Sequence, residues 1–305
     1  MANLDVLEVN KLPEFSTGYI FNSPTFQQLK TGEKTYFLLT RDGKITARIC
    51  FTIENTIAIS GQGATFGSID YEEVLKEEEV SLFIHAFSTR LGQKGIKKII
   101  IKHWPAAYSL NEVFNNAFDK NGYKILSEDV NQHLIIKGEE FSSGIKYNEK
   151  KKLNQALNRN YKFKLLDQGK LAIAYQLIKE TRDRKGYPVS MSLEQLQTTI
   201  NALPEHYLLF GVYDDTQLIA AAVSVRISRD IMYNFYHADD IHYRSSSPVV
   251  MLVEGIYRYC QQNNISILDL GVSSVQGLIN QGLFDFKQNL GCETSNKCTY
   301  VLNHD

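Results

Sequence analysis

The sequence predicts an α+β protein built from two copies of one folding unit, each a twisted mixed sheet flanked by helices. Three observations support this fold class. Runs rich in β-formers alternate with stretches of helical periodicity along the chain. Asp-Gly at 42–43 and Asp-Asp at 214–215 each separate two such runs, as turns of β-hairpins do. The third observation is an internal repeat.

The repeat has a constant spacing. Ile96 and Ile265 lie 169 positions apart, and Gly122 and Gly291 are separated by the same distance. An offset that holds across a helix end, a strand and a terminal glycine is typical of tandem duplication. A chain of 305 residues is long enough for two domains with separate cores. We therefore predict one domain over 1–140 and a second over 141–305, with a helical segment at 146–203.

In the first half, the glycines at 95 and 122 end the two predicted helices. The expected elements are a short strand at 7–9, a helical turn at 21–29, strands at 36–40, 44–52 and 56–59, a helix at 80–93, a strand at 96–102, a helix at 110–121 and further strands at 124–136.

In the second half, Ser192 and Gln195 form a capping box that predicts a helix start. The expected elements are a polar helix from about 146, an amphipathic helix at 171–179, the capped helix from 192, strands at 207–213 and 218–226, an aromatic strand from 231, a helix from Val249 and a strand at 265–270.

The start of the helix at Val249 is a candidate anion site. Ser247 is expected to cap the helix, and Pro248 already has helical φ at the first helical position. Unpaired amides and the helix dipole favour an anion at such an end, and Arg244 adds a full positive charge nearby. The alternative is an ordinary capped helix with a surface arginine.

Two charged residues lie among apolar neighbours further along. Asp269 interrupts a run that reads as a buried strand ending at Gly271, so its carboxylate must be paired or have a raised pKa. Lys287 follows Phe286 and is expected beside a glycine-bounded turn, where a poorly hydrated lysine can stabilise an oxyanion or a phosphate.

These residues carry a family resemblance. An aromatic strand, Ser-Pro before a helix, Asp-Leu-Gly at 269–271 and G-L-x-x-F-K-x-x-x-G at 282–291 together resemble the C-terminal domain of FemABX-type aminoacyltransferases. The pattern is also similar to double-domain acetyltransferases of the GCN5-related (GNAT) superfamily. Val272 and Leu290 depart from the family pattern, which more often has a glycine and an aromatic residue there. The resemblance implies two tandem GNAT-like domains and N-acyl transfer in a cleft between them.

The resemblance also implies roles for residues of the second half. We expect the donor's phosphates at Arg244, Ser245, Ser246, Ser247 and Val249. Lys287 would stabilise the carbonyl oxygen or a donor phosphate, and Asp269, Tyr236 or His237 would relay the proton of the attacking amine. The residues expected at the substrate are Arg182, Tyr187, Tyr233 and Phe286. The first half has Ile100 and Phe118 where the second has Asp269 and Lys287, so the chemistry is expected in the second half.

Composition narrows the class of protein. Net charge is −1 and the pI is near neutral, so no overall positive electrostatic field attracts the protein to nucleic acid or to a membrane. No run is long and apolar enough to predict a membrane span, and no secretory pattern is present, so we expect a cytoplasmic protein. The four cysteines show no paired C-x-x-C motifs, so they are expected to be free thiols without a metal. The sequence does not predict an oligomeric state.

Three functions stay open at this point. The first is transfer of an acyl group from acyl-CoA, such as acetyl-CoA, to a small-molecule amine, which the near-neutral charge favours. The second is a FemABX-type transferase of the peptidoglycan type that uses aminoacyl-tRNA. For this donor, the lysines between 146 and 164 would meet the tRNA backbone, although such runs are usually solvated faces. The third is a non-catalytic small-molecule-binding protein of the same fold.

Overall fold

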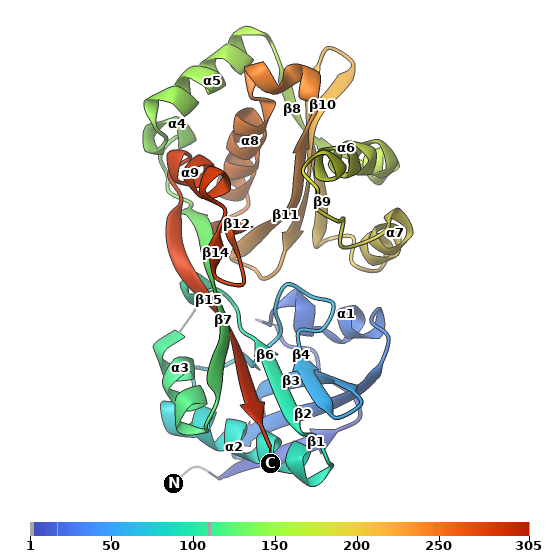
Figure 1. The fold of residues 1–305 in the computed structure, drawn as a ribbon, viewed down its shortest axis with the longest axis vertical. Coiled ribbons are helices and arrows are strands. Elements are labelled where there is room, and N and C mark those ends of the chain that lie inside the picture. Colours follow the sequence, from blue (N-terminus) through green and yellow to red (C-terminus); the bar gives the residue numbers. More distant parts are fainter. Residues whose placement is uncertain (1–2, 17, 109–110, 305) are drawn as a thin grey trace. The chain divides into compact units, whose positions relative to one another are not determined.

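The structure is a computed structural model that describes residues 3–16, 18–108 and 111–304 (Figure 1). The chain forms two compact units. Unit 1 holds the described parts of 1–130, 274–278 and 295–305, and unit 2 holds 131–273 and 279–294. The predicted boundary after residue 140 concerns duplicated halves of the sequence and stays a prediction. The compact units are divided differently: the boundary lies at residue 130, and residues from 295 onward belong to unit 1.

Unit 1 contains strands of a β-sheet together with helices. Its strands follow the order β1 (Leu4–Val9), β2 (Glu33–Arg41), β3 (Lys44–Glu54), β4 (Ile57–Ser60), β6 (Lys98–Lys102), β15 (Glu293–Asn303) and β7 (Lys124–Ile135), and β5 (Asp70–Tyr71) pairs with β3. The helices are η1 (Ile20–Asn22), α1 (Pro24–Gln28), α2 (Glu77–Gln93), η2 (Ala106–Tyr108) and α3 (Asn111–Lys120). The predicted hairpin at Asp42-Gly43 is confirmed as β2 and β3. Leu110, the predicted start of the last helix, lies outside the described residues.

Unit 2 contains the remaining strands of this strand order, in which the final residues of β7 are followed by β12 (Ile267–Val272), β11 (Ile231–Asp239), β10 (Gln217–Arg226), β9 (Tyr207–Asp214) and β8 (Lys162–Leu166). Helices α4 (Phe141–Gly144), α5 (Tyr147–Asn158) and α8 (Pro248–Gln262) lie on one side of this sheet, and α6 (Leu171–Arg184) and α7 (Leu193–Ala202) lie on the other (Figure 1). The remaining elements are η3 (Gln168–Lys170), η4 (Ile241–Ser246), β13 (Ser274–Val275), β14 (Leu278–Ile279) and α9 (Gln281–Asn289).

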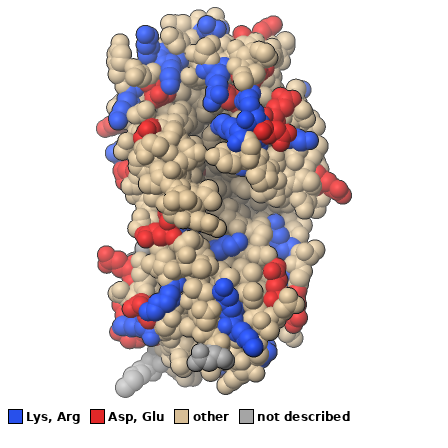
Figure 2. Space-filling view, in the orientation of Figure 1, with Lys and Arg blue, Asp and Glu red and all other residues tan. Residues whose placement is uncertain are grey.

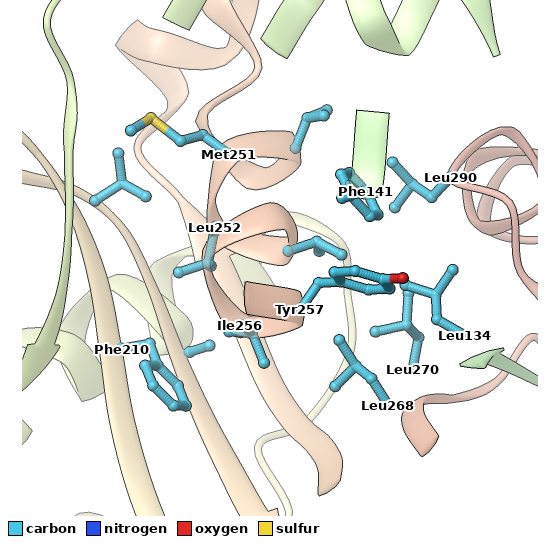
Figure 3. Close-up of a cluster of buried hydrophobic side chains, with 14 of the residues drawn as sticks. Leu134, Phe141, Phe210, Met251, Leu252, Ile256, Tyr257, Leu268, Leu270 and Leu290 are labelled. Atoms are coloured by element: carbon cyan, nitrogen blue, oxygen red, sulfur yellow. The ribbon is translucent and has the colours of Figure 1, made fainter. Parts of the chain in front are cut away.

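Helix α8 is the centre of the unit 2 core. Its apolar face, which includes Leu252 and Ile256, packs on strands β9 to β12, and Tyr257 stacks toward Phe141 of α4 (Figure 3). Strand β10 is buried along almost its whole length because helices cover both of its faces. This double coverage explains why β10 is a nearly continuous apolar run rather than an alternating one.

The repeat seen in the sequence is also a repeat of structure. In α3, the amide of Tyr123 donates to Phe118 O, and after α9 the amide of Cys292 donates to Lys287 O, 169 positions later in each case. Gly122 and Gly291 have matching φ values of 79° and 82° at these helix ends. Each unit also pairs the strands on either side of its long helix in parallel, β4 with β6 and β11 with β12. Duplication as the origin of this similarity remains a prediction.

The sequence analysis did not predict the last helix. Residues 281–289 form helix α9, with the side chain of Asn280 accepting from the amide of Leu283 at its start, and the glycine-bounded turn expected beside Lys287 follows it at Leu290 and Gly291. The nine-residue helix was missed because two phenylalanines and Asp285 obscure its periodicity.

The closest helix-to-strand packing in unit 2 gives a stability prediction. A Cβ added at Gly255 of α8 would lie 2.2 Å from the ring of Phe163 on β8, so Gly255→Ala must displace core side chains. We expect a loss of about 1–3 kcal/mol in the free energy of unfolding, measured by urea denaturation. Gly138→Ala is the matched control, because a Cβ there meets no atom within 4 Å. Equal stability of the two variants would contradict this packing.

Candidate active site

Strands β11 and β12 separate part of the way along their length. They pair in parallel from Ile231 with Ile267 to Tyr233 with Asp269. Beyond this point β11 continues to Asp239, whereas β12, which pairs with β7 along its length, keeps β7 as its partner and pairs Val272 with Asn131 after a register shift. Separated strands must find other partners for their backbone groups, so this gap within unit 2 is a place where a ligand can bind between two strands.

Lys287 closes the β12 side of the gap. Its side chain is 2% exposed, and Nζ donates to Gly271 O at 2.8 Å and to Val272 O at 3.0 Å. Burial lowers its pKa to about 8, and the nearby Asp269 carboxylate opposes that shift. Lys287 is thus a buried ammonium group tied to the end of β12, with one N–H group left for a ligand. The equivalent position in unit 1 is the fully buried Phe118.

Asp269 is fully buried and acts on the backbone. Its Oδ1 accepts from the amide of Gly271 at 2.5 Å and its Oδ2 accepts from Nδ2 of Asn131 at 3.0 Å. Gly271 has φ of +78°, so the carboxylate holds the turn that presents two carbonyls to Lys287. His133 lies opposite Asp269 on β7, and burial lowers the pKa of its ring.

His237 reaches the site through a β-bulge. Val223 of β10 pairs with Tyr236 and Ser224 pairs with Asn234, so Phe235 is an extra residue in β11. The bulge places Asn234 and His237 on one face, with Nδ2 of the asparagine 3.4 Å from Nδ1 of the histidine. An amide nitrogen donates, so Nδ1 accepts and the ring proton lies on Nε2.

The charge around His237 is positive. Burial lowers the pKa of its ring to about 3, and the cations Lys287, Lys185 and Arg182 lower it further. The imidazole is therefore neutral at physiological pH, which suits it to donate a hydrogen bond from Nε2 better than to take up a proton.

Three tyrosines were expected at the site. Tyr236 is buried, with its hydroxyl bonded to Ser190 Oγ at 2.5 Å and the Arg182 guanidinium 5.1 Å from its ring centre. Tyr233 lies against Gly271, where an added Cβ would be 3.3 Å from its ring. Tyr187 lies beside α9, since its hydroxyl accepts from Nδ2 of Asn280 at 3.1 Å.

The loop before α8 differs from the expected cap. Pro248 is the first helical residue as predicted, but the prediction that the side chain of Ser247 caps the helix was wrong. Ser247 adopts a left-handed conformation with φ of 48°, and its own amide donates to Arg244 O at 3.1 Å. The amide of Val250 donates to Ser247 O, and Ser246 Oγ donates to Tyr243 O. Arg244 and Ser245 are exposed polar side chains of η4, as is His242.

A cationic cluster lies at the end of α6. Burial lowers the pKa of Lys185, and the neighbouring charges of Arg244, Arg184 and Arg182 lower it further, while Asp239 opposes them. We call these four cations the α6 cluster; Figure 2 shows Lys and Arg side chains close together in this part of unit 2. Sequence reasoning named Arg182 and Arg244 but missed Arg184 and Lys185, although both stand in the same charged run.

Two of the predicted site residues are mainly packing residues. Phe286 of α9 and Val249 of α8 are partly buried and pack against the hydrophobic core of unit 2. Within the described ranges, no group of three or more His, Cys, Asp or Glu side chains is placed to hold a metal ion. In the same ranges, the helices are all too short or too polar to span a bilayer.

The comparisons with known proteins identify the fold. No family model matches the sequence, and no curated protein matches it. Solved structures do match. FemX superimposes with a TM-score of 0.74 at 14% identity, over 94% of this chain and 93% of that chain. L-PGS from Bacillus licheniformis gives 0.58 at 11% identity, over 88% and 83% of the two chains. A tandem GNAT protein from the clavulanic acid biosynthesis pathway gives 0.53 at 7% identity, over 99% and 98%.

These likenesses confirm the predicted fold class. The chain has a two-domain GNAT-like fold of mixed sheet and helices, similar to that of FemX. At such low identity the likeness extends to the fold and leaves the donor and the acceptor open.

The buried ammonium of Lys287 gives a prediction for stability against pH. The folded protein releases this proton near pH 8, whereas unfolded lysine holds it to about 10.5. Between these values the unfolded state binds more protons, so the free energy of unfolding should rise with pH relative to Lys287→Met. Urea unfolding of both proteins from pH 7 to 10 measures this difference. A difference that stays constant or falls would show that the pKa of Lys287 is not lowered in the folded protein.

Proposed function

We propose that unit 2 is an N-acyltransferase, which moves an acyl group from a phosphate-bearing donor to an amine. The observation that carries this proposal is the convergence of charges at the β11–β12 gap. The neutral imidazole of His237 interacts electrostatically with Lys287 and with Lys185 and Arg182 of the α6 cluster. Acyl transfer from a polyanionic substrate requires groups of this kind: a hydrogen-bond donor, a buried ammonium and a cationic cluster.

The chemistry follows from these groups. The nitrogen of a neutral amine attacks the donor's carbonyl carbon, a C–N bond forms, and the bond to the donor's oxygen or sulfur breaks. Negative charge develops on the carbonyl oxygen and then on the leaving group. His237 Nε2–H and the remaining N–H of Lys287 would stabilise these charges. The amine's proton ends on the leaving group.

The proton relay is reassigned by this proposal. Asp269 accepts hydrogen bonds from Gly271 and Asn131, and the hydroxyl of Tyr236 is bonded to Ser190. Both groups are better suited to positioning Gly271 and Arg182 than to taking a proton. The amine must therefore arrive deprotonated, as substrate, and the protein acts by orientation and electrostatics.

Of the two donors, an aminoacyl ester of tRNA is favoured. A coenzyme A diphosphate would bind a set of free amides at the start of α8, but Pro248 has no amide and the amides of Ser247 and Val250 already donate to the backbone, so among these four residues the amide of Val249 is the one left for it. Recognition of phosphate then falls to the side chains of the α6 cluster. The likeness to FemX, over nearly the whole of both chains, supports the same donor class. Acyl-CoA is the second candidate, supported by the likeness to the tandem GNAT protein.

The proposal is tested with both donors. Purified protein is incubated with labelled aminoacyl-tRNA or acetyl-CoA and a panel of primary amines, and amide formation is measured. Lys287→Met should lower kcat by about 10²–10³-fold, the effect of losing one oxyanion donor, while the donor still raises the melting temperature. Turnover of neither donor, with stabilisation by one of them, would support the non-catalytic binding protein instead.

The α6 cluster gives a separate prediction. Lys185→Gln combined with Arg244→Gln should raise KM for the donor about tenfold or more and leave kcat within a few-fold, because these cations bind donor phosphate in the ground and transition states alike. Lys179→Gln, a change at an exposed lysine of the same helix, is the control and should change neither constant. An unchanged KM in the double variant would place the donor elsewhere.

A further inference from the structure

A strongly basic surface lies outside the gap, on α5 and β8. Residues 141–166 contain seven Lys and Arg side chains and a single acidic residue, Glu149, in a protein whose net charge is −1. Glu149 is buried, and its carboxylate accepts from Lys152 at 2.8 Å. The exposed charge of this segment is therefore positive, and Figure 2 shows Lys and Arg side chains over α5 in the upper part of the view.

The exposed face of α5 combines cations with amides and one ring. It forms a shallow hollow of about 500 Å³, lined by Tyr147, Lys150, Lys151, Asn154, Gln155 and Asn158. Tyr147 is 80% exposed, so its ring is accessible to a ligand. The opposite face of α5, with Leu153 and Ala156, is buried in the core of unit 2. The hollow thus lies on a rigidly anchored helix.

The basic face connects to the site through a chain of contacts within unit 2. At the end of α5, Nη1 of Arg159 donates to the hydroxyl of Tyr161 at 3.5 Å. That hydroxyl is bonded to Ser246 Oγ at 3.0 Å, and Ser246 follows Arg244 of the α6 cluster by two positions. A polyanion bound at the α6 cluster can therefore extend past η4 onto α5, whose 12 residues span about 18 Å.

We propose that the exposed face of α5 binds the phosphodiester backbone of the RNA that carries the acyl group. Lys150 and Lys151 contact phosphates, Asn154 and Asn158 donate hydrogen bonds to phosphate or sugar oxygens, and Tyr147 stacks on an unpaired base. The inference rests on the proposed function, because it names the part of the protein that holds the donor's RNA.

RNA fits this surface better than an anionic membrane does. A helix that lies in a bilayer surface needs a continuous apolar face toward the lipid. On α5 the side chains between the lysines are amides, the apolar face is buried, and the half-exposed Leu157 adds little apolar surface. Lysines interspersed with amides and an exposed ring are typical of contacts to a nucleic-acid strand.

Binding, without turnover, tests the proposal. The probe is a synthetic RNA hairpin with a single-stranded 3′ end, and its affinity for the full chain is measured by fluorescence anisotropy from 50 to 200 mM salt. Lys150→Glu combined with Lys151→Glu should weaken binding at least tenfold and reduce the slope of log K against log salt by about 1.5–2. Tyr147→Ala should cost about tenfold without changing the slope, as expected for lost stacking. Lys11→Glu combined with Lys97→Glu makes the same charge change at exposed lysines of unit 1 and should leave affinity within twofold.

The outcomes separate this inference from the proposed function. RNA that fails to bind the wild-type protein, or binds it equally well after the Lys150 and Lys151 changes, overturns the α5 surface. Turnover of acetyl-CoA would then still support acyl transfer. Binding of vesicles of 30% phosphatidylglycerol that is lost in the α5 variant, with no RNA binding, would also overturn the proposal in favour of a membrane surface. Circular dichroism of each variant establishes that it is folded.

Discussion

The candidate site depends on one interaction, the ammonium group of Lys287 bound to the carbonyls of Gly271 and Val272. A buried cation without acceptors would cost several kcal/mol, so this lysine requires the two carbonyls to point inward. They point inward because Gly271 has a positive φ and Asp269 accepts from its amide. The same turn lies where the pairing of β12 with β7 shifts register, just past the last residue pair between β12 and β11. The gap between the strands and the charge beside it therefore have a common physical cause.

Unit 1 has a different interaction at the position equivalent to Lys287. Unit 1 has Phe118 at the position of Lys287, and that ring stacks on Tyr300 with centroids 4.4 Å apart, in an ordinary aromatic core. Stability alone favours the aromatic choice, because it carries no desolvation cost. Unit 2 thus has a buried lysine that costs stability, whereas unit 1 has an apolar residue at the same position. This difference is expected if unit 2 carries the reactive groups and unit 1 has mainly a structural role.

Much of the fold could be predicted from the sequence, because its signals are local. Hairpin turns and helix-ending glycines are each visible within a few residues, and the offset of 169 positions comes from comparing such local signals in the two halves. The geometry of the site is not local. The bulge at Phe235 depends on the register between β10 and β11, and the left-handed backbone of Ser247 depends on η4 before it. Lys185 becomes a site candidate once the fold brings Arg244 beside it. Near-neutral net charge also conceals the basic α5, because acidic residues elsewhere in the chain offset it.

The most direct test of the account is the titration of Lys287 itself. In protein labelled with ¹³C at lysine Cε, the Lys287 resonance, assigned by its loss in Lys287→Met, should titrate with a pKa near 8. Bound donor should raise that pKa, because developing or fixed negative charge favours the ammonium form. A Lys287 signal with an ordinary pKa near 10.5 that does not respond to either donor would contradict the claim that a buried ammonium faces the reacting atoms.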